Sequence, residues 1–209
     1  MKNKHTADPN RFPFFETIRV AGGMVKHADL HLERMRRTCF IHYNEFHFKN
    51  IFNHLQLPEN GIMKLNIWYN QHETEIKVTE YVPAAIKKIK VVDCDPDFDY
   101  SFKYSDRSYL NNLLQSATGA DEIIIIKNGM VTDTSKANIV FEKNGEFFTP
   151  DTFLLNGTMR QHLLHTGKMI EKTIKAEDIF SYEKMYFVNA LNPLEITPAI
   201  SCKTLSSQL

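Results

Sequence analysis

Lys103 is the first residue in this sequence whose surroundings suggest chemistry. It lies between Phe102 and Tyr104, just ahead of a stretch with helical spacing of leucines. An amine held among aromatic groups loses hydration, which favours its neutral form and makes it a better nucleophile toward a carbonyl carbon. Taken alone, however, the residue more simply predicts a surface lysine at the entrance to a helix.

Asp133 is the second candidate. It stands in Thr132-Asp133-Thr134-Ser135, within a turn-like segment, 131–138, that follows an apolar strand. A carboxylate at this place could keep the ring nitrogen of an aromatic cofactor protonated. It could equally accept hydrogen bonds from its own backbone in a turn. The residue alone leaves both interpretations open.

A third candidate is the segment Asn156-Gly157-Thr158-Met159-Arg160, which precedes Leu163 and Leu164. We expect a helix to begin here. The unpaired N–H groups and positive dipole of a helix start suit a phosphate, and Gly157 would let the anion approach closely. Many helices begin in this way, so the segment alone is weak evidence for a phosphate site.

One residue of the first half could join this group. Arg34 could grip a phosphate through two parallel hydrogen bonds. It follows His31 by three positions on a predicted helix, so the two side chains would occupy neighbouring surface. A solvated basic helix face would explain them as well. Together, an amine, a carboxylate and a helix start could bind an aldehyde, a ring nitrogen and a phosphate, the three handles of pyridoxal 5'-phosphate.

Bulk composition excludes several classes of protein. The chain has 209 residues, 43% hydrophobic and 24% charged, and its 25 basic residues match its 25 acidic ones. There is no basic excess for nucleic acid, no apolar run of about 20 residues for a membrane, and no apolar N-terminal core for secretion. Three scattered cysteines suggest a reducing, cytoplasmic location. Because HExxH, GxGxxG, GxxxxGK[ST] and GxSxG are missing, we expect no metal site and no common nucleotide or hydrolase motif.

The hydrophobic pattern predicts a small α+β domain over 1–82, with a linker at 82–85. Its expected elements are strands at 12–20, 62–69 and 73–81, a helix capped by Asp29, and a weaker helix at 46–55. We expect residues 83–209 to form a second, larger domain. There we expect a helix around Leu110 and a polar tail from Ser201 that frays, together with strands at 86–92, 123–126, 139–141, 147–150, 185–188 and 196–200.

Several motifs, taken in order, resemble the fold-type IV pyridoxal-phosphate enzymes, the class IV aminotransferase family. The resemblance covers most of the chain and rests on FFETIRV…HLERM, KYSDR, GMVTDTSKANIVF, FFTPD…LLNGTMRQ and VNALNPLEITP. It implies the D-amino acid aminotransferase-like fold: a small N-terminal α+β domain, a larger C-terminal domain built on a β-barrel, and pyridoxal 5'-phosphate between them. It also implies a small-molecule amino substrate and a homodimer.

The resemblance also assigns roles to residues. Lys103 would be the Schiff-base lysine, Arg34 a phosphate ligand, and Asp133 would stand where the family usually carries a glutamate that contacts the pyridine nitrogen. Phe15 and Arg107 would contact the substrate, Arg107 through a carboxylate unless it is an ordinary surface arginine. Further cofactor contacts would come from Asn138, Gly157, Thr158, Met159, Asn189 and Ala190.

Three reactions share this frame: branched-chain amino acid transamination, D-amino acid transamination, and the lyase reaction that converts 4-amino-4-deoxychorismate to 4-aminobenzoate and pyruvate. In each, Lys103 would move the substrate's α-proton. The spacing Lys103-x-x-x-Arg107 and the GTMRQ form of the phosphate turn resemble the lyase subgroup. The sequence therefore favours the lyase, with the aminotransferases as the alternative.

Overall fold

A computed structural model describes residues 7–207 of the chain, which divides into two compact units. The first runs to Val82 and also includes Phe102–Arg107, whereas the second consists of Pro83–Ser101 and the chain from Ser108 onward. Each unit has its own sheet and its own hydrophobic core. The mixed α+β class predicted from the sequence is therefore confirmed.

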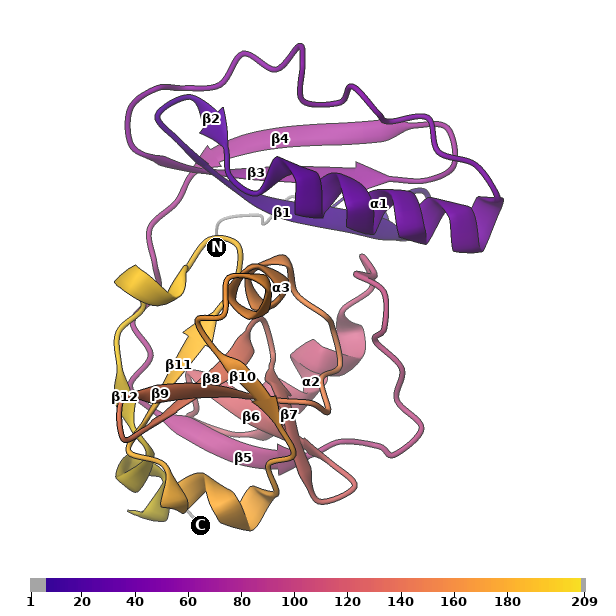
Figure 1. The fold of residues 1–209 in the computed structure, drawn as a ribbon. Helices are drawn as coiled ribbons and strands as arrows, with labels where there is room; N and C mark the ends of the chain where they lie inside the picture. Colours follow the sequence, from indigo (N-terminus) through magenta and orange to yellow (C-terminus); the bar gives the residue numbers. More distant parts are fainter. Residues whose placement is uncertain (1–6, 208–209) are drawn as a thin grey trace. The chain divides into compact units, whose positions relative to one another are not determined.

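The first unit is a four-stranded antiparallel sheet with the helix α1 packed on one face (Figure 1). The order β2-β1-β3-β4 places β1 and β3 in the centre. Gly22 and Gly23, with φ of 61° and 68°, make the turn between β1 and β2, a conformation that other residues adopt at a steric cost. The elements are β1 (Phe14–Ala21), β2 (Met24–Val25), α1 (Ala28–Tyr43), β3 (Ile62–Tyr69) and β4 (Thr74–Glu80).

The segment Phe102–Arg107 extends this first unit, although in the sequence it follows β5 (Ile89–Asp93), a strand of the second unit. The N–H of Phe15 donates to the carbonyl of Lys103 at 3.1 Å, and the N–H of Ser105 donates to the carbonyl of Pro13 at 2.8 Å. The sequence pattern predicts that this segment belongs to the second domain, 83–209. Backbone pairing with the start of β1 instead fixes Lys103 in the first unit.

The second unit is an eight-stranded sheet that curls round its own core (Figure 1). The pairing runs β10-β9-β8-β7-β6-β5, and β8 also pairs with β11, which pairs with β12. Only β5–β6 and β9–β10 are parallel among these pairs. The strands are β5 (Ile89–Asp93), β6 (Glu122–Lys127), β7 (Met130–Thr134), β8 (Asn138–Lys143), β9 (Glu146–Pro150), β10 (Ile170–Lys172), β11 (Lys184–Val188) and β12 (Ile200–Ser201).

Short helices complete the second unit. They are α2 (Ser108–Ser116), α3 (Thr158–His165) and the 3-10 turns η1 (Ala176–Ser181), η2 (Leu194–Ile196) and η3 (Cys202–Ser207). The predicted start of α3 at Gly157-Thr158 is confirmed. Within residues 7–207, none of the helices combines the length and the apolar character that a membrane crossing requires.

Several local predictions were wrong. Residues 46–55 form irregular backbone with turns at 49–54 rather than a helix. Their apolar side chains reach the core from this segment after Asn44 ends α1 in a left-handed conformation. His27, rather than Asp29, is the N-cap of α1. The first part of the segment 131–138, which the sequence predicts to be turn-like, instead belongs to β7, and the strand expected at 196–200 is reduced to β12. Up to residue 207 the tail does not fray, because Cys202 and Leu205 are buried.

Candidate functional site

A buried charged cluster in the first unit joins β1 to α1. Arg34 donates to the Glu16 carboxylate through Nε (2.8 Å to Oε1) and Nη2 (2.5 Å to Oε2). His31 Nδ1 lies 2.7 Å from Glu16 Oε2. Glu16 and His31 have no exposed surface and Arg34 is 8% exposed. The three side chains therefore hold one another in a fixed arrangement.

The local sequence explains why these polar groups are inside. On β1, Glu16 occupies the same face as Phe14 and Ile18, since side chains alternate along a strand. On α1, His31 and Arg34 share the buried face with Met35, one turn further along. The solvated basic helix face considered for His31 and Arg34 is therefore wrong. Sequence reasoning passed over Glu16, although a glutamate at an inward position of an apolar strand could have revealed it.

Electrostatics in this cluster favour an ionised acid and a neutral histidine. Burial would raise the pKa of Glu16, but the charge and hydrogen bonds of Arg34, with help from His31, lower it to about 2. Burial lowers the pKa of His31, against the opposing influence of Glu16. The positive charges of Arg34 and Lys103 lower it further.

Lys103 stands next to this cluster. Its ammonium lies 4.6 Å from the centroid of the Phe15 ring, a cation–π distance, and its side chain is half-buried. Its backbone carbonyl accepts from the N–H of Phe15, the residue next to Glu16 on β1. The first unit thus brings together three of the residues singled out from the sequence, Phe15, Arg34 and Lys103. Arg107 lies at the end of the same short segment and is half-buried.

Asp133 is the centre of a second polar cluster, in the second unit. It ends up 5% exposed, next to the end of β7. Its Oδ1 accepts from Asn138 Nδ2 at 2.7 Å, and its Oδ2 accepts from the N–H groups of Leu154 and Leu155 at 3.0 and 2.9 Å. Burial raises its pKa to about 6, although these hydrogen bonds and the charge of Arg160 oppose the shift. Its proton is therefore exchanged close to neutral pH.

Gly157 touches this cluster at the start of α3. Its φ of −66° and ψ of 149° are open to any residue, so its conformation does not require glycine. The lack of space around it does require glycine, because a Cβ at this position would lie 2.1 Å from Asn138 Oδ1. Asn138 itself is held by Asp133 and by the carbonyl of Leu155, 2.9 Å away. The helix begins directly afterwards at Thr158, and its N-cap residue, Gly157, has no side chain that could cap it.

The turn after β11 lies beside the same group of residues. Val188, the last residue of β11, is paired with Asn138. In the turn that follows, the Asn189 side chain accepts from the N–H groups of Leu191 and Asn192, both at 3.0 Å. Ala190 is half-buried in this turn. The second unit therefore contains seven of the residues predicted to bind the cofactor: Asp133, Asn138, Gly157, Thr158, Met159, Asn189 and Ala190.

Arg160 supports this region, although the sequence alone predicts no role for it. It is 1% exposed and lies 4.2 Å from the Phe153 ring centroid. Its guanidinium donates to Asn156 Oδ1 and to the Pro150 carbonyl, both at 3.1 Å, and pairs with Glu171. These bonds tie the end of β9 to the start of α3. The i, i+3 spacing of Arg160 and buried Leu163 could have indicated its inward position.

Comparison with known proteins places the chain in a family. The sequence profile described as "Amino-transferase class IV" matches residues 13–202. A protein of Haemophilus influenzae described only as uncharacterized is 40% identical over 188 residues, which are 88% of this chain and 100% of that protein.

Solved structures show the same fold. A "putative 4-amino-4-deoxychorismate lyase" from Haemophilus somnus 129pt is 37% identical with a TM-score of 0.81, covering 88% of this chain and 98% of that one. The PLP-bound form of a hypothetical aminotransferase from Mycobacterium tuberculosis is 16% identical with a TM-score of 0.69, covering 96% and 84%. The second likeness shows the fold alone.

Proposed function

Since the chain belongs to the class IV aminotransferase family, we propose that it is a pyridoxal-phosphate-dependent lyase that converts 4-amino-4-deoxychorismate to 4-aminobenzoate and pyruvate. The likeness to the Haemophilus somnus protein supports this reaction over the others of the family. So do the spacing of Lys103 and Arg107 and the GTMRQ sequence at the start of α3.

The observation that carries the cofactor assignment is the contact between Gly157 and Asn138 at the start of α3. Any Cβ at position 157 would meet Asn138 Oδ1 at 2.1 Å, so glycine keeps the N-terminus of this helix next to the Asp133 cluster. The first N–H groups of α3 and the dipole of the helix suit a phosphate. Thr158 and Met159 would hold the phosphate of pyridoxal 5'-phosphate here.

When bound, pyridoxal phosphate supplies an aldehyde that an amine can capture and a pyridine ring that withdraws electrons from the reacting carbon. In this proposal Lys103 Nζ is the amine, and it accepts and returns the substrate's α-proton. Its contact with the Phe15 ring limits the directions in which the amine can point. Atoms balance without another reactant, because the substrate divides into the two products.

Arg34 would bind the cofactor's phosphate, and Glu16 would orient it. The two-bond pairing of Nε and Nη2 with Glu16 fixes the plane of the guanidinium. A glutamate with a pKa of about 2 stays ionised throughout the neutral range, so it keeps this grip. Arg107 would bind a carboxylate of the substrate.

Asp133 would face the pyridine nitrogen. It accepts three hydrogen bonds, and an ionised carboxylate offers about four lone-pair positions. The remaining capacity matches one N–H donor. A pKa of about 6 also lets this carboxyl share a proton with the ring nitrogen near neutral pH. Through Leu154 and Leu155 the same side chain positions the loop that leads to Gly157.

The same residues would also serve branched-chain or D-amino acid transamination, the alternative function. The two functions are distinguished by their products. Purified protein supplied with pyridoxal phosphate should form 4-aminobenzoate from 4-amino-4-deoxychorismate. Lys103→Ala should lower the rate by about 100- to 10,000-fold, because it removes the proton-transfer group. Lys49→Ala, at an exposed position of the same unit, is the control.

Amino acids supplied with 2-oxoglutarate provide the opposing test. If glutamate is formed from branched-chain or D-amino acids and no 4-aminobenzoate is formed from 4-amino-4-deoxychorismate, the protein is an aminotransferase and the lyase proposal is wrong. Arg107→Gln should raise the KM for 4-amino-4-deoxychorismate more than it lowers kcat, because it removes a contact with a substrate carboxylate that does not react.

A further inference from the structure

Two loop segments of the first unit bring three metal-binding side chains together. Glu45 and His47 follow α1, and His72 lies in the turn between β3 and β4. One possible ligand atom from each residue lies within 4.8 Å of the other two. We propose that Glu45, His47 and His72 bind one divalent transition-metal ion, with Zn²⁺ as the ion to test.

Alternation in the sequence explains why Glu45 and His47 point the same way. Phe46 and Phe48 pack against the core of the first unit, and Phe48 lies edge-on to Tyr69. In an extended segment, side chains alternate between two sides. Glu45 and His47 therefore occupy the outer side, where their side chains are 35% and 51% exposed.

The turn that carries His72 is held by its neighbour. The Asn70 side-chain oxygen accepts from the N–H groups of His72 and Glu73 at 2.9 and 2.8 Å. Asn70 also donates to the carbonyl of Arg11 at 3.0 Å. These bonds fix the backbone from which the His72 imidazole projects.

Glu45 is already oriented as a metal ligand would be. Gln71 donates to its Oε1 at 2.5 Å, which leaves Oε2 directed at His47 Nε2, 2.9 Å away. Hydrogen bonds of this kind to the far oxygen typically orient carboxylate ligands.

The donor set selects the class of ion. Two imidazole nitrogens and one carboxylate oxygen suit zinc and its neighbours, whereas calcium and magnesium prefer oxygen ligands throughout. Zinc bonds of about 2.0–2.2 Å in a tetrahedron place ligand atoms roughly 3.4 Å apart. Exposed side chains can close from the present separations to that distance by rotating. A fourth position would remain for water.

The sequence offered little indication of this group. Its residues come from two segments that are separated by β3, so they form no contiguous motif of the HExxH kind. A bound ion would link the segment after α1 to the β3–β4 turn. It would therefore stabilise the first unit independently of any cofactor.

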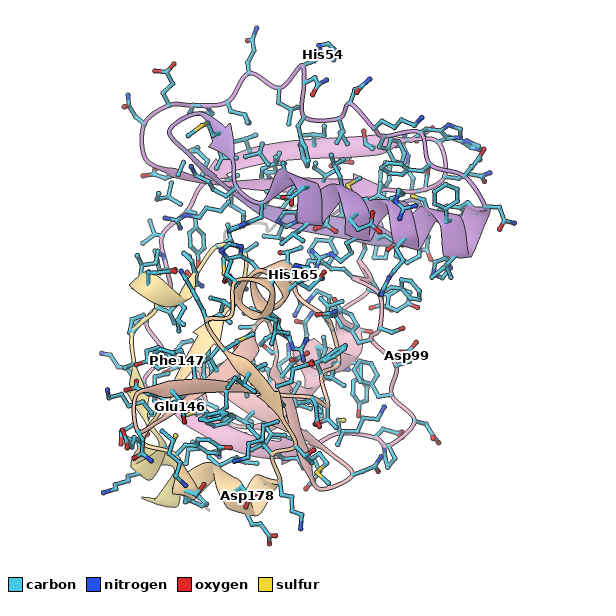
Figure 2. The ribbon with its side chains drawn as sticks, in the orientation of Figure 1. His54, Asp99, Glu146, Phe147, His165 and Asp178 are labelled. Carbon is cyan, nitrogen blue, oxygen red and sulfur yellow. The ribbon has the colours of Figure 1, made fainter. Side chains whose placement is uncertain are left out.

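Zinc titration of the untagged, full-length protein tests the proposal. We expect one Zn²⁺ per chain in a competition assay against a chromophoric chelator. Affinity should fall at least tenfold in His47→Ala, in His72→Ala and in Glu45→Gln. His54→Ala, which changes another exposed histidine of the same unit, should bind as the unchanged protein does (Figure 2).

A second readout separates ligand loss from misfolding. Zn²⁺ should raise the melting temperature of the unchanged protein and of His54→Ala, with reversal by a chelator, and should leave His72→Ala unmoved. Far-ultraviolet circular dichroism without metal should be the same for all variants. The proposal is overturned if His72→Ala and Glu45→Gln bind Zn²⁺ as tightly as the unchanged protein, or if the unchanged protein binds none.

Discussion

Replacing Gly157 by alanine tests the packing at the start of α3. Backbone strain plays no part, because φ of −66° and ψ of 149° suit alanine. The new methyl group would instead lie 2.1 Å from Asn138 Oδ1, so the Asn138 side chain must move. Its two hydrogen bonds, to Asp133 and to the Leu155 carbonyl, would then weaken or break. Overpacking and a lost bond to a buried carboxyl together predict a cost of about 2–4 kcal/mol in the free energy of unfolding.

Hydrogen exchange is the sharpest assay for this change. The amides of Leu154 and Leu155 donate to Asp133, so their protection should fall along with the thermal stability. The control is a double-mutant cycle with Asn138→Ala, which removes the group that the methyl would meet. In that background Gly157→Ala should cost less than about 0.5 kcal/mol, since no carboxamide remains to be displaced. An equal cost in both backgrounds, or no cost in either, would refute the steric explanation.

Two further predictions concern the buried acids. Glu16→Gln should destabilise the first unit by about 3–5 kcal/mol at pH 7, measured by urea unfolding with Trp68 emission, because Arg34 loses its buried partner. The lowered pKa of Glu16 stabilises the folded state above pH 4.5, so the difference should shrink by on the order of 3 kcal/mol as the pH falls toward 2; a constant difference would contradict the assignment. The raised pKa of Asp133 has the opposite effect on stability, because protonation of this carboxyl favours the folded state. As the pH falls from 7 to 4, this group should therefore add on the order of 3 kcal/mol to the free energy of unfolding. Asp133→Asn should lack this gain when thermal unfolding is measured over the same pH range.

Patterns of period two made much of the fold predictable. The strand expected at 62–69 coincides with β3, and the strand expected at 73–81 lies within one residue of β4 at each end, because the alternation of side chains is a local property. The segment 46–55 misled for the same reason. The spacing of its apolar residues suits a helix, yet their side chains pack against the core from turns and irregular backbone.

The long-range arrangement was harder to predict. The backbone hydrogen bond between Lys103 and the start of β1 joins residues about 90 positions apart, and no local sequence pattern predicts it. The burial of Arg34 was missed because Glu16, its partner, lies on another element. Motif order identified the candidate cofactor residues, whereas the internal bonds of Asp133 and the fit of Gly157 against Asn138 required three-dimensional contacts.

Titration with pyridoxal phosphate, followed by visible absorption, tests the central claim most directly. The proposal predicts that the purified protein acquires the absorption band of bound cofactor at one equivalent per chain and keeps it through desalting. Lys103→Ala should lose the cofactor on desalting, while Lys49→Ala should retain it. A protein that stays colourless with excess pyridoxal phosphate, or a Lys103→Ala variant with an unchanged band, would contradict the account.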